Sequence, residues 1–400
     1  MTGARNLGNL IDSRDPGKTA IIDLGGEHPP REFSYGALDA MANGVARALA
    51  RRELKGGDRV AILSANRAEY LASYFGIMRA GLVAVPVNFK FPRATVDFIL
   101  RDSDAKLVLC DPPRRDDCPS DIAVVCFGCE GNESFESFLN PGPFQTIVPG
   151  PNEPAMFLYT SGSTGIPKGV ALSHQSHVWV AETRFTEDLS RQRFLIAAPL
   201  YHMNALALSI LACLAHGTIV LLPQFTASAY IDAIGRYRAT WLTAVPPMIS
   251  MMLRESDLLA RTDLSCIESV RMGSAPVSVS LMEALRRTLP QATVINAYGT
   301  TEAGPVVFAP QPSGPQMSLG TQHPKVRLRL VDGNNRDANE GELEVKSPAL
   351  MLGYHNRPDL PPPFTSDGFC RTGDVFRRDK DGFYYFVGRT DDMFVSGGEN

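Results

Sequence analysis

The sequence predicts an α/β protein with two α/β lobes, each built on a mostly parallel sheet, and a smaller β-rich lobe. Three observations support this prediction. Apolar segments typical of buried strands alternate with segments of helical period, which is the pattern of parallel sheets covered by helices. Four hundred residues, 44% of them hydrophobic, exceed what one simple core contains. After Pro310 the pattern changes to short strands and turns.

The first lobe is expected over about residues 1–190. Apolar positions within residues 35–49 follow a helical period, and the pair Gly56-Gly57 ends the pattern. The next elements are expected, in order, as strand 59–63, helix 68–79, strand 82–87, helix 92–100 and strand 106–110. Residues 111–151 are polar and rich in Pro, Asp and Cys, which predicts an irregular crossover.

A second alternating segment predicts the second lobe, over about residues 191–310. Its strands are expected at 194–197, 219–222, 241–245, 269–272 and 293–296. The β-rich lobe is expected over about residues 311–390. It contains strand-like segments at 325–331, 341–345 and 383–387, with turn signals at Asp332-Gly333 and Asp381-Gly382.

The charge balance limits the classes of partner. The net charge is −4, and charged residues make up 20% of the chain. With no basic field, the chain is not expected to bind nucleic acid or anionic lipid, so its partners should be small molecules. No run reaches the ~20 apolar residues of a membrane-spanning helix, and residues 1–12 lack the features of a signal peptide. We expect a cytoplasmic protein, whose oligomeric state the sequence does not indicate.

The cysteines give little support for a metal site. Cys126 and Cys129 have the spacing of half a zinc knuckle, but no second Cys/His pair lies at the distance found in zinc fingers. Residues 122–125 read instead as a strand. We therefore expect buried, reduced thiols. His174 with His177 also lacks a third ligand nearby.

Residues 159–169 concentrate glycines, hydroxyl side chains and Lys168. Glycines allow backbone N–H groups to approach an anion, hydroxyls add donors and lysine adds a mobile charge, so the segment predicts a phosphate-binding loop. It is not a Walker A loop, because its spacing differs and Pro167 stands where that motif needs glycine. A flexible linker is the alternative. Strand-like residues at 155–158 and 170–172 favour a hairpin instead.

Three further motifs follow this loop. They are Asn296-Ala297-Tyr298-Gly299-Thr300-Thr301-Glu302, Arg371-Thr372-Gly373-Asp374 and Gly388-Arg389-Thr390-Asp391-Asp392. In this order and at these separations, the four motifs resemble the adenylate-forming superfamily of acyl-CoA synthetases, carrier-protein adenylation domains and beetle luciferases. The resemblance covers essentially the whole chain. It implies an AMP-binding adenylation domain over residues 1–390, which uses ATP to convert a carboxylic acid to an acyl-adenylate and then to its CoA thioester, releasing AMP and pyrophosphate.

The resemblance also implies which residues hold the nucleotide. The β- and γ-phosphates would be held by Thr160, Ser161, Gly162, Ser163, Thr164, Gly165 and Lys168. The adenosine part would be held by Gly273, Ser274, Ala275, Pro276, Asn296, Ala297, Tyr298, Gly299, Thr300, Asp374 and Arg389. In that set Tyr298 offers a flat face to adenine, whereas Asp374 accepts hydrogen bonds from the ribose hydroxyls and Arg389 is a second ribose contact.

Four residues are the catalytic candidates. Thr301 would contact the α-phosphate, Glu302 would bind Mg²⁺ through a hard oxygen, and Lys168 would steady the leaving phosphates. His202, in the segment 199–206, would lie beside the carboxylate of the acid. The alternatives are a helix cap for Thr301, a solvated hairpin lysine for Lys168 and a packed core histidine for His202.

The part of the site that binds the carboxylic acid is expected to be apolar. His202, Met203, Ala244 and Gly299 are the substrate-binding candidates, and no carboxylate lies between Pro199 and Leu211 to pair with an amino group. This argues against an amino acid as substrate and favours a fatty or aromatic acid.

The resemblance implies a further domain that this chain does not contain. In the family a small C-terminal domain carries a catalytic lysine and much of the CoA surface, and it rotates about a hinge that corresponds to Asp391. Residues 391–400 are therefore expected to be this hinge and the start of that domain, and the chain is expected to form thioester slowly. ATP, Mg²⁺ and coenzyme A are the implied cofactors and co-substrates. The alternatives are loading of a carrier-protein thiol and a non-catalytic module that binds adenylates.

Overall fold

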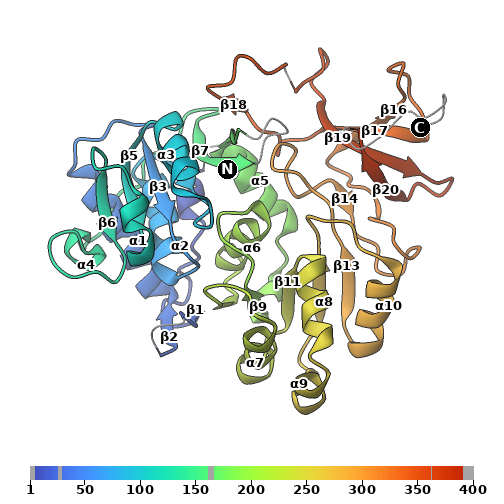
Figure 1. Cartoon of the computed structure of the whole chain (residues 1–400), viewed down its shortest axis with the longest axis horizontal. Coiled ribbons are helices and arrows are strands. Elements are labelled where there is room, and N and C mark those ends of the chain that lie inside the picture. The colour runs from blue at the N-terminus through green and yellow to red at the C-terminus, as the bar shows by residue number, and fades with distance from the viewer. Residues whose placement is uncertain (1–4, 26–28, 161–165, 362, 391–400) are drawn as a thin grey trace.

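The computed structural model describes residues 5–25, 29–160, 166–361 and 363–390. Within these residues it contains two seven-stranded sheets, a four-stranded sheet and a two-stranded ribbon. Figure 1 shows the two large sheets with their covering helices and the smaller sheet at the upper right, near the end of the chain. The predicted α/β class, with two mostly parallel sheets and a β-rich part, is confirmed.

The first large sheet has the strand order β18-β8-β7-β4-β3-β5-β6. Its strands are β3 (Arg59–Leu63), β4 (Val83–Pro86), β5 (Ala105–Cys110), β6 (Ala123–Cys126), β7 (Pro154–Thr160), β8 (Lys168–Ser173) and β18 (Gly353–His355). All neighbours are parallel except the pairs β7-β8 and β8-β18. The expected hairpin around the glycine-rich loop is therefore present, with Thr160 opposite Lys168.

The helices connected to this sheet largely follow the predicted periodicity. They are α1 (Tyr35–Ala50), α2 (Ala68–Arg79), α3 (Arg93–Asp102), α4 (Phe135–Phe138) and α5 (His174–Arg184), with 3₁₀ turns η1 (Leu7–Asn9), η2 (Pro112–Asp117) and η3 (Glu187–Arg191). α1 begins where predicted, because the Ser34 side chain accepts a hydrogen bond from the Ala37 backbone N–H. The segment 111–151 is more ordered than expected, since it contains η2, β6 and α4.

The second large sheet has the order β13-β12-β11-β9-β10-β1-β2. Its strands are β1 (Thr19–Asp23), β2 (Arg31–Ser34), β9 (Arg193–Ile196), β10 (Thr218–Leu221), β11 (Trp241–Ala244), β12 (Ser269–Met272) and β13 (Thr293–Asn296). Its helices are α6 (Met203–Leu214), α7 (Ala227–Tyr237), α8 (Pro246–Arg254), α9 (Ser256–Arg261) and α10 (Val279–Thr288). Only the β1-β2 pair is antiparallel. Six neighbouring parallel strands therefore end at the same edge of the sheet.

The smaller sheet is antiparallel. It comprises β16 (Arg327–Val331), β17 (Glu340–Lys346), β19 (Cys370–Arg378) and β20 (Tyr384–Arg389), and the two-stranded ribbon comprises β14 (Phe308–Ala309) and β15 (Thr321–Gln322). A separate apolar cluster that includes Phe308, Leu343 and Phe376 joins the ribbon to this sheet. This packing fixes β19 and β20 beside the carboxyl end of β13.

Each expected lobe is a continuous segment of the sequence, but each of the two large sheets contains a strand from outside that segment. β1 pairs with β10, so an N-terminal strand belongs to the second sheet. β18 pairs with β8, so a strand from the expected third lobe extends the first sheet. Both are short strands whose partners lie far away in the sequence, and local patterns do not specify such pairings. The pairing of β18 brings Tyr354 opposite Val170, close to the glycine-rich hairpin.

The expectation of reduced thiols was wrong for one pair of cysteines. Cys126 and Cys129 form a disulfide. β6 ends at Cys126 and the chain turns back at Gly128, whose φ is 72°, so the two Cα atoms lie 5.4 Å apart, within the range a disulfide spans. The other five cysteines are free. Among the described residues no group of three metal ligands occurs, and no helix combines the length and apolarity needed to cross a membrane.

Candidate active site

The cavities that collect the predicted site residues lie at the carboxyl ends of β11, β12 and β13. This edge is where open parallel sheets bind their ligands. An outer cavity of about 360 Å³ is lined by Ser274, Ala275, Pro276, Val277, Asn296, Ala297, Tyr298, Gly299, Thr300, Met317, Leu319, Asp374, Tyr385, Phe386 and Arg389. The structure therefore gathers ten of the eleven residues expected around adenosine; the other, Gly273, lines the neighbouring inner cavity.

Asp374 is held from two sides at the wall of the outer cavity. Its Oδ2 accepts a hydrogen bond of 2.5 Å from the Tyr298 hydroxyl, and its Oδ1 accepts one of 2.9 Å from Arg389 Nη1. Burial raises the pKa of Asp374, although Tyr298 and Arg389 oppose that rise. Burial and the Asp374 charge together raise the pKa of Tyr298 well above its ordinary value. Each carboxylate oxygen has two acceptor sites, so Asp374 can still accept bonds from a ligand.

Two glycines shape the backbone next to this wall. A Cβ on Gly273 would lie 2.9 Å from the Ala297 carbonyl oxygen, and one on Gly299 would lie 2.7 Å from the Pro305 Cα. Both positions therefore require glycine, because the neighbouring backbone is too close for any side chain. Ser274 follows with a φ of 66°, a left-handed conformation uncommon for a residue with a side chain. This turn lines both the outer and the inner cavity.

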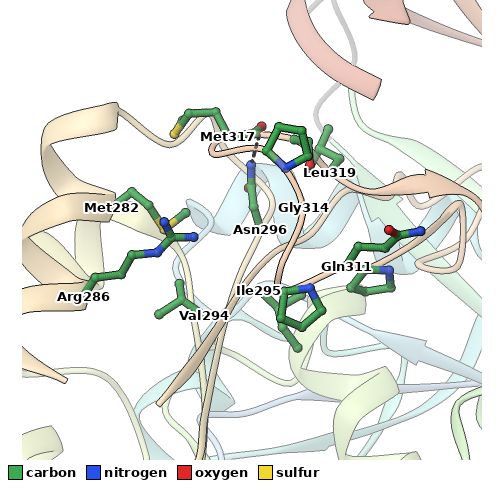
Figure 2. A pocket seen from close by; sticks show the side chains of 13 residues that line it. Met282, Arg286, Val294, Ile295, Asn296, Gln311, Gly314, Met317 and Leu319 are labelled. Atoms are coloured by element: carbon green, nitrogen blue, oxygen red, sulfur yellow. Dashed lines mark hydrogen bonds between the residues drawn. The ribbon is translucent and has the colours of Figure 1, made fainter. Parts of the chain in front are cut away.

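A small cavity of about 20 Å³ lies behind the outer one. Figure 2 shows Arg286 entering it from α10, with Asn296 at the end of β13 directed toward Met317. The Asn296 side-chain N–H donates to the Met317 carbonyl oxygen at 3.3 Å, and both residues also line the outer cavity. Asn296 therefore connects β13 to the segment 315–319 and helps to hold the wall of the outer cavity in place.

The inner cavity, of about 590 Å³, contains the predicted acyl-side residues. It is lined by Lys90, Ala198, Pro199, Tyr201, His202, Met203, Asn204, Val245, Met248, Arg271, Gly273, Ser274, Ala297, Tyr298, Gly299, Thr300, Thr301 and Pro305. His202 occupies the N-cap position of α6, makes no capping hydrogen bond through its side chain, and is accessible from this cavity. Surrounding protein and the nearby Lys90 lower the pKa of His202, so its ring is neutral at pH 7.

One predicted substrate contact does not reach the inner cavity. Ala244 is fully buried at the end of β11, and the next residue, Val245, contributes to the wall instead. Successive side chains of a strand point to opposite faces, so one position of register decides which of the two is a lining residue. Ala244 acts through its backbone, because its carbonyl accepts a hydrogen bond from the Gly273 N–H at 3.3 Å.

Tyr354 on β18 connects Lys168 with Glu302, and the motifs gave no indication of it. The Tyr354 hydroxyl donates to Glu302 Oε1 at 3.0 Å, while Lys168 Nζ lies 4.9 Å from the centre of the tyrosine ring. Glu302 directly follows Thr301, which lines the inner cavity, so Tyr354 contacts both the carboxylate and the lysine beside this cavity. No local pattern marks Tyr354, because its role depends on the pairing of β18 with β8.

The described residues fit a magnesium ion bound together with a ligand. They provide the Glu302 carboxylate, and no group of three or more His, Cys, Asp or Glu side chains that could hold a metal ion occurs among the residues that the structure describes. Mg²⁺ commonly uses one or two protein carboxylates and takes its other ligands from phosphate oxygens and water. Thr160, whose hydroxyl has no hydrogen-bond partner among the described residues, ends β7. Ser161, Gly162, Ser163, Thr164, Gly165 and Asp391 lie outside the described residues.

The chain is similar to known acid–CoA ligases over almost its whole length. It matches the AMP-binding enzyme family over residues 12–355. It is 32% identical to an indoleacetate–CoA ligase of Aromatoleum aromaticum, covering 96% of this chain and 78% of that protein. It is also 30% identical to a long-chain-fatty-acid–CoA ligase of Mycobacterium tuberculosis, covering 92% and 75% of the respective chains.

A solved structure agrees with these sequence matches. The crystal structure of ATP-bound MatB from Rhodopseudomonas palustris superimposes with a TM-score of 0.89 at 30% identity, covering 99% of this chain and 81% of that one. The resemblance carried by the four motifs is therefore confirmed on sequence and on fold. The chain belongs to the AMP-binding enzyme family, within the adenylate-forming superfamily.

Proposed function

We propose that this protein activates a carboxylic acid with ATP, forming an acyl-adenylate that is passed on as a CoA thioester. The observation that carries the proposal is the junction of the two main cavities. Ser274, Ala297, Tyr298, Gly299 and Thr300 line both, so a nucleotide in the outer cavity and an acid in the inner cavity would meet there. Bringing the two reactants together at one point is the main requirement of this reaction.

The nucleotide is proposed to be held in the outer cavity by side chains that are already oriented by hydrogen bonds within the protein. Asp374, oriented by Tyr298 and Arg389, would accept bonds from both ribose hydroxyls. Thr301 would donate to the α-phosphate, and Lys168 would neutralise part of the charge on the leaving pyrophosphate. Mg²⁺, when bound by Glu302 and phosphate oxygens, supplies further neutralisation of phosphate charge. Tyr354 would hold Glu302 and Lys168 in position for these roles.

The acid is proposed to bind with its reacting carboxylate beside His202. A protonated histidine would hold the carboxylate in an ion pair and reduce its electron-donating power, whereas the neutral ring can hydrogen-bond without doing so. The lowered pKa of His202 supports the neutral form at pH 7. The attack forms a bond from the carboxylate oxygen to the α-phosphorus and breaks the bond to pyrophosphate. A cytoplasmic location and CoA as the acceptor thiol belong to the same proposal.

The test is acid-dependent incorporation of labelled pyrophosphate into ATP, run with a panel of carboxylic acids. The proposal expects exchange with at least one acid and a loss of exchange in both Glu302→Gln and Asp374→Asn. Glu283→Gln, at an exposed position of α10, and Asp97→Asn, at a partly exposed position of α3 remote from the cavities, are the matched controls. Exchange that both site variants leave unchanged would refute the assigned roles. Failure of the protein to bind AMP by calorimetry would refute the site itself.

A further inference from the structure

A third cavity extends the inner one toward the end of α5. This side cavity, of about 230 Å³, is lined by Thr183, Arg184, Leu211, Trp241, Arg271, Ile295, Asn296, Ala297, Tyr298, Pro305, Val306, Phe308, Pro310, Leu319 and His323. It shares Arg271, Ala297, Tyr298 and Pro305 with the inner cavity. An acid placed with its reacting carboxylate at His202 can therefore extend past Arg271 toward Arg184.

Neither of the two arginines has an anionic partner among the residues that the structure describes. Arg184, the last residue of α5, makes no hydrogen bond or ion pair with any residue that the structure describes. The one hydrogen bond of the Arg271 side chain within the same residues is a long one of 3.4 Å, from Nη2 to the Pro305 carbonyl oxygen. The lining of the side cavity contains no aspartate or glutamate. Other enclosed arginines differ: Arg79 pairs with Asp39, and Arg67 pairs with Glu69 and Asp111.

Such an arrangement is unfavourable in the absence of a ligand. Burial lowers the pKa of Arg184 well below its ordinary value, and the positive charge of Arg271 adds to the effect. Burial alone lowers the pKa of Arg271 to about 10. A guanidinium stays protonated at neutral pH, so two like charges face one cavity from which much of the water is excluded. Unpaired buried charges are rare unless they bind something, and a carboxylate or sulfonate matches the fork of N–H donors on each guanidinium.

We propose that the acid activated by this protein carries a second anionic group, a carboxylate or a sulfonate, which Arg184 and Arg271 bind in the side cavity. The proposal rests on the proposed function and names its substrate class. It refines the expectation of a fatty or aromatic acid, because Met203, Val245 and Met248 provide an apolar wall along the inner cavity, whereas the side cavity beyond it contains two arginines. The middle of the acid would be apolar and its two ends anionic.

The first test compares acids that differ only in the second charge. Acid-dependent pyrophosphate exchange is measured with the dicarboxylic acids from succinate to suberate, with their monomethyl esters, and with 3-sulfopropionate. We expect kcat/KM for at least one doubly anionic acid to exceed that of its ester, or of butyrate for the sulfonate, by about tenfold or more. Preference for a dicarboxylate or for the sulfonate identifies the anionic group. Equal or better use of the uncharged counterparts would overturn the proposal.

Variants assign this preference to the two arginines. Arg184→Met and Arg271→Met keep most of the side-chain volume and remove the charge, and each should lower kcat/KM for the preferred acid by about tenfold while changing that for its ester by less than about threefold. Arg184→Lys should retain part of the preference. Arg287→Met, at an exposed position of α10, is the matched control. Equal losses on the charged and uncharged acids would contradict the proposed contact.

Thermal unfolding without ligand separates binding from a structural role. If the arginines await an anion, Arg184→Met should raise the melting temperature, because it removes a partly buried charge that has no partner among the described residues. A lower melting temperature in this variant would indicate a structural contact and overturn the proposal. If no acid supports exchange, the proposed function fails. In that case each acid is titrated by calorimetry in the presence of AMP. Tighter binding of the doubly anionic acids than of their singly charged counterparts would support the proposed anion site, and equal binding would reject it.

Discussion

The outer cavity and the side cavity satisfy their charged groups in different ways. In the outer cavity the Asp374 carboxylate already has two donors, Tyr298 and Arg389. In the side cavity Arg184 and Arg271 face each other's charge with no carboxylate beside them. Both cavities are lined by Asn296 at the end of β13 and by Ala297 and Tyr298, which follow it, so the difference arises between neighbouring sites of one fold.

This difference indicates what the outer cavity and the side cavity each contribute to ligand binding. Groups that are already oriented lose little entropy when a ligand arrives, so the outer cavity is preorganised for a nucleotide. A pair of unpartnered guanidiniums instead needs a ligand charge for its own stability, so the side cavity selects among acids. The shared family chemistry thus lies where charges are balanced within the chain, and the proposed specificity lies where they are not.

The largest expected effect is at Asp374, in the outer cavity, where the charged groups are paired within the chain. Asp374→Asn replaces the acceptor of four hydrogen bonds, two from the protein and two from the ribose, with an amide that cannot accept them all. We expect AMP affinity to fall by about 2–3 kcal/mol, on the order of 100-fold, as for loss of hydrogen bonds to a charged group. Calorimetry measures this, with Asp97→Asn as the control. Unchanged affinity would show that Asp374 is a structural residue of β19.

Glu302→Gln should affect the metal-dependent step more than nucleotide recognition. Removing the carboxylate should weaken Mg²⁺-dependent ATP binding by about 2 kcal/mol, roughly thirtyfold, because a charged ligand of the ion is lost. AMP binding without Mg²⁺ should stay close to that of the unaltered protein. Titrations with ATP at several Mg²⁺ concentrations separate the two effects. An equal loss for AMP would assign Glu302 to the nucleotide rather than to the metal.

Two buried histidines of α5, His174 and His177, predict how stability depends on pH. Burial lowers the pKa of His174 to about 4 and that of His177 to about 3, from an ordinary value of 6.5. Between pH 6.5 and 4 the unfolded chain therefore binds more protons than the folded one, so stability is full above 6.5 and is lost as the pH falls. The slope should be about 1.4 kcal/mol per pH unit for each histidine.

Urea unfolding at a series of pH values measures this slope. His177→Gln should remove about half of it, since one of the two buried rings is then absent. The His177 ring contacts Met203 Sδ at 3.2 Å, so loss of the folded state at low pH should also disturb the wall of the inner cavity. A free energy of unfolding that stays constant from pH 7 to pH 4.5 would show that the two histidines are protonated in the folded protein.

The smallest expected effect is at Tyr354. Tyr354→Phe removes one neutral donor to Glu302 and keeps the ring beneath Lys168. We expect pyrophosphate exchange to fall by about 1 kcal/mol, roughly fivefold, through weaker positioning of Glu302. Tyr354→Leu should cost more, because the ring contact of Lys168 is then lost as well. If the phenylalanine variant were as impaired as Glu302→Gln, the hydroxyl would have to contact the substrate directly.

Much of the fold could be predicted from local pattern. Strands β9 to β13 of the second sheet have strong apolar patterns, as helices α1 to α3 do, and apolar segments form the two strands of the hairpin β7-β8. β1 and β18 were missed because each contains five residues or fewer and pairs with a strand distant in the sequence. β2, a strand of four residues whose partner is β1, was missed with it. The Cys126–Cys129 disulfide depends on a turn conformation that residue spacing alone does not specify.

The site was predictable to the extent that its residues lie in motifs. Asp374, Arg389 and Tyr298 come from three separate motifs and meet in the outer cavity. Ala244 was predicted to contact the acid, but the neighbouring Val245 lines the inner cavity instead, because successive side chains of a strand point to opposite faces. Arg184 and Arg271 were not predicted as site residues, because they lie in no motif. That neither has an acidic partner among the described residues is visible only in the structure.

The most direct test of the account is a crystal structure of the protein with a non-hydrolysable adenylate, the sulfamoyl adenosine of the preferred doubly anionic acid. The account predicts the ribose hydroxyls on the Asp374 carboxylate, the sulfamoyl group beside Thr301, and the acyl chain passing His202 to end between Arg184 and Arg271. An adenosine bound away from Asp374, or an acyl chain whose second anionic group points to solvent, would contradict it.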